Sequence, residues 1–109
     1  MKDIVWIGSS HNDLMDFPRE AKKEAGYQLD KVQRGFNPSD WKPMASIGLG
    51  VKEIRLHEQN EYRVIYVATF VDTVYVLHAF CKKTQKTSSK DLELAKKRFM
   101  TLKYERVYA

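Results

Sequence analysis

The chain of 109 residues lacks several features that define whole classes of protein. Cys81 is its only cysteine, so no internal disulfide can form, and no Cys or His pairs have the spacing of a zinc site. The longest nearly unbroken apolar run, residues 64–71, is far shorter than the roughly 20 residues of a membrane-spanning helix. The N-terminus also has no apolar stretch that could form a signal-peptide core. We therefore expect a cytoplasmic protein with no cofactor, no metal and no contact with a membrane.

The composition is that of one globular domain, 1–109, with 43% hydrophobic and 12% aromatic residues. Its charge is unevenly distributed, because residues 62–109 carry 10 Lys and Arg against 4 Asp and Glu, whereas residues 1–61 carry 9 against 10. A concentrated positive field attracts polyanions such as nucleic acid without sequence specificity. The alternative is a solvated face that only keeps the protein soluble.

The N-terminal half predicts one strand and two helices. Residues 4–7 are apolar and mostly β-branched, which favours a strand ended by Gly8. Ser9 or Ser10 can cap a first helix that runs toward Phe17. Pro18 fits the first turn of a second helix that ends near residue 35. A buried stripe on this second helix is predicted by four residues at helical spacing: Ala21, Ala25, Leu29 and Val32.

The middle of the chain predicts a loop followed by a β-meander. Residues 35–50 are rich in Pro, Gly, Asn, Ser and Asp, so we expect a long surface loop there. Residues 52–57 alternate between apolar and polar side chains, which is typical of a half-buried strand. Residues 62–70 and 73–82 are apolar on both faces, as in strands covered on both sides. With a turn at residues 58–61, these segments predict three antiparallel strands.

The C-terminus predicts a basic amphipathic helix. Ser88 or Ser89 can cap it, and Asp91 completes part of a capping box with Ser88. Its apolar stripe consists of Leu92, Ala95, Phe99 and Leu102. The predicted fold is therefore α+β: an antiparallel sheet packed with two N-terminal helices and one C-terminal helix.

Arg63 is an unusual residue in a strand otherwise built for burial. An arginine in that position must be paired or solvated, since burying an unpaired charge costs several kcal/mol. It can serve a function, or it can form a salt bridge with Glu53 or Glu61, or lie at an edge where its side chain reaches water.

A second basic cluster follows the last predicted strand, before the cap of the final helix. Neighbouring antiparallel strands align their ends, so Lys82 can lie beside Arg63, and Arg55 can reach the same area. Tyrosines on the central strand would stack on bases. Besides Arg63, we assign to this predicted cationic patch the residues Arg55, Tyr62, Tyr66, Lys82, Lys83, Gln85 and Lys86.

Such a patch suits cleavage of RNA by its own 2′-hydroxyl, because Arg and Lys stabilise the charge that develops on the phosphoryl oxygens. No proton-transfer pair is evident. His78 alternates with apolar neighbours and is interpreted as a packed histidine, whereas His57 and His11 are interpreted as surface residues. A lysine with a lowered pKa, or a tyrosine, could move the protons instead.

Four segments resemble the RelE/ParE toxin superfamily, and within it most closely the phage-derived, HigB-like branch. They are residues 50–56 (GVKEIRL), 62–67 (YRVIYV), 74–87 (VYVLHAFCKKTQKT) and 91–96 (DLELAK). The resemblance implies a RelE-like fold and the toxin of a type II toxin–antitoxin system that cuts mRNA on the ribosome. It also implies a helix-turn-helix antitoxin as partner.

By position in these motifs, the resemblance implies catalytic roles for Arg63 and for Lys82 or Lys83, and Arg55 fits one of the family's basic residues on the preceding strand. To Arg55 and the remaining residues of the patch we assign contacts with RNA. The sequence departs from RelE in two respects: Glu53 occupies a basic strand position, and no tyrosine follows the lysine cluster before the last helix. ParE-like members of the same fold inhibit DNA gyrase. The alternatives are therefore a gyrase inhibitor, a non-catalytic nucleic-acid-binding member and a degenerate remnant without activity.

Overall fold

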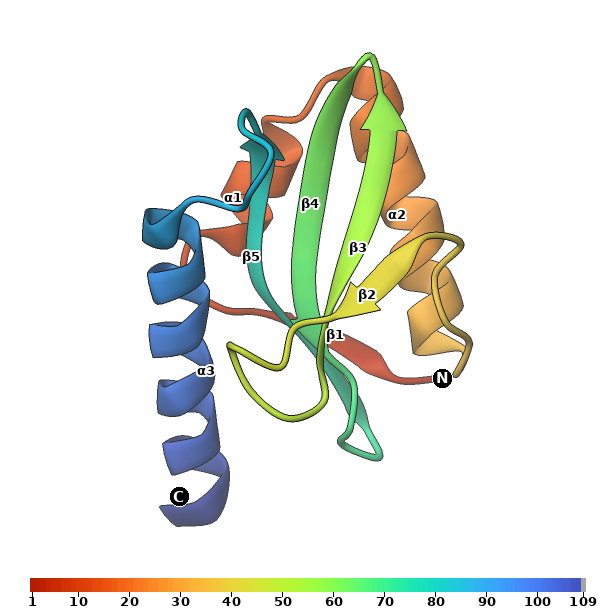
Figure 1. The fold of residues 1–109 in the computed structure, drawn as a ribbon. Helices are drawn as coiled ribbons and strands as arrows, with labels where there is room; N and C mark the ends of the chain where they lie inside the picture. Colours follow the sequence, from red (N-terminus) through yellow and green to blue (C-terminus); the bar gives the residue numbers. More distant parts are fainter. Residues whose placement is uncertain (109) are drawn as a thin grey trace.

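The computed structural model describes residues 1–108, which form a five-stranded sheet with helices on both faces (Figure 1). The sequence prediction of an α+β fold with two N-terminal helices and one C-terminal helix is confirmed. Within these residues, no helix is both long enough and apolar enough to cross a membrane. The elements are β1 (Asp3–Trp6), α1 (Ser10–Met15), α2 (Arg19–Gln33), β2 (Trp41–Pro43), β3 (Val51–Glu58), β4 (Asn60–Val67), β5 (Thr73–Lys82) and α3 (Ser89–Tyr108).

The sheet has the order β1-β5-β4-β3-β2, and its centre is the predicted antiparallel meander of β3, β4 and β5. β1 pairs with β5 in parallel, so the complete sheet is mixed rather than antiparallel throughout. The predicted turn at residues 58–61 is very tight: Gln59 alone separates β3 from β4 and has a φ of 66°. A bulge shifts the register between β4 and β5 at Ile65 and Tyr66.

The expectation of an irregular loop over residues 35–50 is wrong for its middle, where β2 pairs antiparallel with β3. The short strand is held by a backbone hydrogen bond from Met44 N to Val51 O (2.8 Å) and by the Lys52 ammonium over the Trp41 ring (4.4 Å). Pro43 is tolerated because β2 is an edge strand. β2 therefore adds to the sheet side chains that were expected in a loop.

The helices lie close to their predicted positions. Pro18 immediately precedes α2, and the Ser88 Oγ caps α3 by accepting a hydrogen bond from Asp91 N (3.1 Å). The predicted stripe on α2 is buried throughout: Ala21, Ala25, Leu29 and Val32. Of the stripe on α3, three residues are buried and Leu92 is half-buried; the buried ones are Ala95, Phe99 and Leu102.

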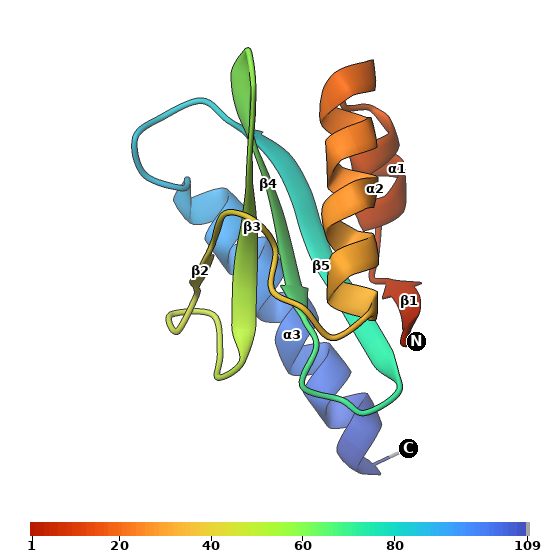
Figure 2. The same ribbon diagram turned by 90° about the vertical axis from the view of Figure 1, so that its right-hand side faces the viewer.

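The sheet separates two apolar cores, with α1 and α2 on one side and α3 on the other (Figure 2). α3 covers only part of its face of the sheet, and the end of this face toward the β3–β4 hairpin extends beyond the helix (Figure 1). Charged side chains replace apolar ones at that end. The fold thus leaves one polar region of the sheet without a helix over it.

Two glycines provide a test of this packing. A Cβ at Gly48 would overlap the ring of Phe99, whereas a Cβ at Gly26 in the interior of α2 would meet no atom within 4 Å. We predict that Gly48→Ala lowers the free energy of unfolding by about 1–3 kcal/mol, because α3 must shift. Gly26→Ala should raise it by about 0.5–1 kcal/mol through better helix propensity. Urea unfolding followed by circular dichroism measures both, and equal stabilities would contradict the packing of α3.

Candidate functional site

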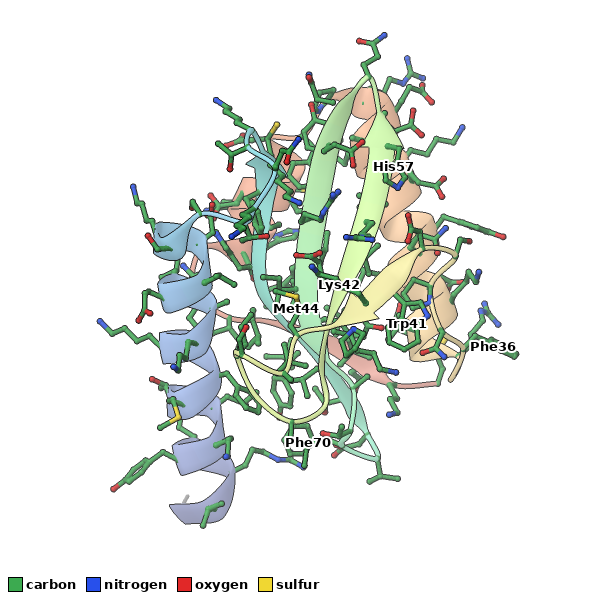
Figure 3. All side chains as sticks on the ribbon, in the orientation of Figure 1. Phe36, Trp41, Lys42, Met44, His57 and Phe70 are labelled. Atoms are coloured by element: carbon green, nitrogen blue, oxygen red, sulfur yellow. The ribbon has the colours of Figure 1, made fainter. Side chains whose placement is uncertain are left out.

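The uncovered end of the sheet brings together charged residues from four strands. The register pairs Lys42 with Glu53, Arg55 with Arg63, and Glu61 with both His57 and Lys82. Lys42 and His57 lie on the same face of the sheet as α3 (Figure 3). We call this region the charged face and define it as Lys42, Glu53, Arg55, His57, Glu61, Arg63 and Lys82.

A buried ionic cluster forms the base of the charged face. The Glu53 carboxylate is fully buried, with Oε1 3.5 Å from Arg63 Nε and 3.7 Å from Arg55 Nε. Arg63 Nη2 lies 3.1 Å from Glu61 Oε1, and Arg63 Nη1 donates a hydrogen bond to Tyr62 O (3.0 Å). Only 5% of the Arg63 side chain is exposed. The salt-bridge interpretation of Arg63 is therefore confirmed, with both of the glutamates that the sequence suggested.

Lys82 and Arg55 supply the more accessible positive charge beside this cluster. Partial burial and the nearby Arg63 lower the pKa of Lys82, with smaller contributions from Lys42 and Arg55 in the same direction. Glu53 opposes this effect by raising it. Arg55 is one-third exposed. The predicted meeting of Arg55, Arg63 and Lys82 at one end of the sheet is thus observed.

His57 is held between two carboxylates at the edge of the charged face. Its Nε2 lies 2.6 Å from Asp40 Oδ2, and its Nδ1 lies 2.8 Å from the Glu61 carboxylate. Hydrogen bonds to Asp40 and then Glu61 raise the pKa of His57, and the bond to His57 lowers the pKa of Glu61, with help from Arg63. This contact joins the segment before β2 to the β3–β4 hairpin.

Tyr62 and Tyr66 do not belong to the site, which corrects the prediction that they stack on bases there. Both are buried in the core on the opposite side of the sheet, beneath α2. The reason is the two-residue period of a strand, which turns the neighbours of Arg63 to the other face. Burial also raises the pKa of Tyr66 far above its ordinary value.

The polar residues at the end of β5 and after it lie in different places. Lys82 lies on the charged face, whereas Lys83 lines a groove between α1 and the start of α3, together with Cys81 and Lys90. Gln85 and Lys86 are exposed in the loop that leads from β5 to α3 and arches outward on the α3 side of the sheet (Figure 2). Lys83, Gln85 and Lys86 are therefore near the end of β5 in sequence but take no part in the ionic cluster of the charged face.

The packed interpretation of His78 is confirmed. Its Nε2 lies 2.7 Å from Asp91 Oδ1, its ring stacks on Phe80, and it is almost fully buried. His11 is exposed and lies against the ring of Trp6. The contacts given for His78 and His11 are thus with residues outside the charged face.

Lys42, Asp40 and the bridging position of His57 were not predicted from the sequence. Lys42 was missed because β2 was not predicted, and Asp40 lies 17 residues before its partner. The alternation over residues 52–57 does place His57 on the same face as Arg55, which was the available signal. Within residues 1–108, no group of three His, Cys, Asp or Glu side chains has an arrangement that could hold a metal ion.

The buried cluster predicts that mutations of its members have non-additive effects on the free energy of unfolding. Arg63→Met should lower the free energy of unfolding by about 3–5 kcal/mol, because Glu53 is left as a buried and poorly paired charge. Adding Glu53→Gln should restore part of that loss, so that the two changes are not additive. Urea unfolding tests this, with Arg34→Met as the control. Arg34 pairs with Asp30 on the surface, and its loss should cost less than about 1 kcal/mol. Full additivity would contradict the coupling.

The His57 contact predicts a pH-dependent stability. A raised pKa of His57 stabilises the fold below its ordinary value of 6.5, and this contribution is lost as the pH rises through the pKa of the folded state. The lowered pKa of Glu61 stabilises the fold above 4.5 and is lost at lower pH. The free energy of unfolding of the parent should therefore exceed that of His57→Gln by less than about 1 kcal/mol, and the difference should be largest between about pH 4.5 and 6.5. Chemical unfolding across this range measures the difference, and a difference independent of pH would refute the bridge. His11→Gln is the control.

Comparison with known proteins identifies the family. Residues 12–100 match the family described as "Phage derived protein Gp49-like (DUF891)", so the match spans every strand of the charged face. A search of curated proteins finds no match. The fold and this match agree with the resemblance stated from the motifs. The chain belongs to the Gp49-like phage-derived family, a RelE/HigB-like toxin family of toxin–antitoxin systems.

Proposed function

We propose that this chain is the toxin of a type II toxin–antitoxin system and belongs to the HigB-like branch of the RelE/ParE superfamily. We further propose that it cuts mRNA on the translating ribosome. The charged face is the observation that carries the proposal. It places four cationic side chains in one region of the sheet that no helix covers; they are Lys42, Arg55, Arg63 and Lys82. Membership of a toxin family supports the same conclusion.

The reaction is a transesterification within the RNA. The 2′-oxygen forms a bond to the adjacent phosphorus, the bond from phosphorus to the 5′-oxygen breaks, and the products are a 2′,3′-cyclic phosphate and a 5′-hydroxyl. Negative charge develops on the phosphoryl oxygens during the step, and fixed cations stabilise it. The protein side chains can supply this charge themselves, so the proposal needs no metal ion.

Arg55 and Lys82 are the cations best placed to contact the reacting phosphate, because both are partly exposed. Arg63 lies beneath them, and its Nη2 becomes available to a phosphate oxygen when Glu61 moves away. Lys83, Gln85 and Lys86 surround the end of β5 and would contact the RNA backbone outside the reacting nucleotide. Tyr62 and Tyr66 have no part in this proposal.

A toxin of this type acts in the cytoplasm and needs an antitoxin. We expect a helix-turn-helix protein to cover the charged face or to prevent access to the ribosome. The basic outer surface of α3 and the exposed lysines after β5 offer it an electrostatically complementary surface if its toxin-binding segment is acidic.

Cleavage in cells tests the proposal. Brief induction of the parent should produce mRNA ends within translated regions, detected by primer extension. Lys82→Met should reduce the cut products by about 100-fold, the usual effect of losing one group that stabilises transition-state charge. Lys82 is preferable to Arg63 because we expect Arg63→Met to destabilise the fold as well.

Lys97→Met is the matched control, since Lys97 is exposed on α3 and lies outside the apolar stripe. It should leave both the pattern and the amount of cutting unchanged. Intact mRNA after induction of the parent would eliminate the ribonuclease, and DNA breaks in the same cells would indicate a gyrase inhibitor. Equal loss of cutting in both variants would reduce the role of Lys82 to general positive charge.

A further inference from the structure

The proposed cleavage needs a group that removes a proton from the 2′-hydroxyl and a group that gives one to the leaving 5′-oxygen. The cationic residues of the charged face stabilise charge, and the lowered pKa of Lys82 suits it to at most one of the two transfers, so these residues do not form a complete pair. One carboxylate and one imidazole on the same face are exposed: the side chain of Glu61 is 44% exposed and that of His57 is 53% exposed. They are cross-strand partners in the β3–β4 hairpin.

The contacts of these two side chains fix complementary protonation states. A carboxylate lies within hydrogen-bond distance of each ring nitrogen of His57, so the ring is most stable as an imidazolium that donates from both nitrogens. Glu61 accepts from His57 and lies 3.1 Å from Arg63 Nη2, so it is held ionised. An acid in its protonated form is therefore adjacent to a base in its deprotonated form.

The position of the pair relative to the cations suits the reaction. Glu61 is the cross-strand partner of Lys82, and His57 lies two residues from Arg55 on the same face of β3. A phosphate between Arg55 and Lys82 would thus lie beside both groups. Asp40 approaches from the segment before β2, where its backbone carbonyl accepts a hydrogen bond from Arg55 N (2.9 Å). Its carboxylate is fixed on the far side of the imidazole.

We propose that Glu61 and His57 are the proton-transfer pair of the charged face, an inference that rests on the proposed function. Glu61 turns from His57 and Arg63 to the 2′-hydroxyl and takes its proton as the 2′-oxygen attacks phosphorus. This movement frees His57 Nδ1–H, which gives its proton to the 5′-oxygen as the bond from phosphorus breaks. Asp40 is a positioning residue that holds Nε2 and keeps the ring directed at the site.

The same contacts permit a purely structural role, in which His57 only fastens the hairpin to the segment before β2. That role predicts a change in stability but no specific dependence of catalysis on either group. The leaving group distinguishes the two cases. A 5′-oxygen needs a proton to depart, whereas a 5′-sulfur departs readily as a thiolate and needs no general acid.

The experiment compares two mRNAs bound to ribosomes, one with a 5′-oxygen and one with a bridging 5′-sulfur at the scissile phosphate. Single-turnover cleavage is measured for the parent, Glu61→Gln, His57→Gln and, as control, His11→Gln. We expect both site variants to lose at least 100-fold on the 5′-oxygen substrate. On the 5′-sulfur substrate, His57→Gln should recover to near the rate of the parent, and Glu61→Gln should stay slow.

The pH profile provides a second readout. Four charged groups from different elements face the pair: Asp40 from the segment before β2, Arg55 from β3, Arg63 from β4 and Lys82 from β5. The parent should show a bell-shaped profile, Glu61→Gln should lose the limb at low pH, and His57→Gln the limb at high pH. Asp40→Asn should move the limb at high pH toward lower pH, because one of the contacts that raises the pKa of His57 is weakened.

Three results would overturn the pair. Failure of the 5′-sulfur to rescue His57→Gln would assign His57 a structural role. Parent-like cleavage by Glu61→Gln and His57→Gln, with Lys82→Met inactive, would leave the ribonuclease intact and exclude these residues as its proton carriers. An absence of cleavage by the parent on either substrate would instead remove the proposed function, and the pair with it.

Discussion

The charged face depends on one buried carboxylate. Glu53 lies at the centre of a strand among cations that would otherwise repel one another, since like charges about 4 Å apart interact by roughly 4 kcal/mol near a protein surface. Its two close contacts, with Arg55 and Arg63, allow a guanidinium to occupy a strand that is otherwise apolar. Arg63 in turn holds Glu61, and Glu61 contacts His57. The positions of the exposed side chains therefore depend, through these contacts, on Glu53, which is fully buried and inaccessible to a substrate.

The sequence predicted those parts of the fold that depend on local periodicity. The apolar stripes of α2 and α3 and the alternation in β3 are properties of neighbouring residues, so they could be identified without the structure. The convergence of Arg55, Arg63 and Lys82 also followed, because a meander with short turns aligns the ends of its strands. Salt bridges of Arg63 with Glu53 or Glu61 could also be suggested from the sequence, because both glutamates are within ten residues of Arg63.

What the sequence could not reveal depends on pairing between distant segments. β2 has three residues in a region rich in turn formers, and only its partner β3 makes it a strand. Without β2 neither Lys42 nor Asp40 could be assigned to the site. The error at Tyr62 and Tyr66 is different, since strand alternation already places them opposite Arg63. An aromatic side chain on a strand can stack on a base or fill a core, and here both rings belong to the core beneath α2.

Binding RNA and cleaving RNA require different arrangements of charge, and in this chain the two arrangements lie in different regions. On the charged face, four cations are accompanied by Glu53, Glu61 and the nearby Asp40, so much of the positive charge is already paired. The unpaired excess lies in the C-terminal part of the sequence, on the loop after β5 and the exposed side of α3. A purely cationic patch would bind any polyanion and hold its product. A site in which a phosphate must displace a carboxylate binds more weakly, but the displaced carboxylate is then free to act on the substrate.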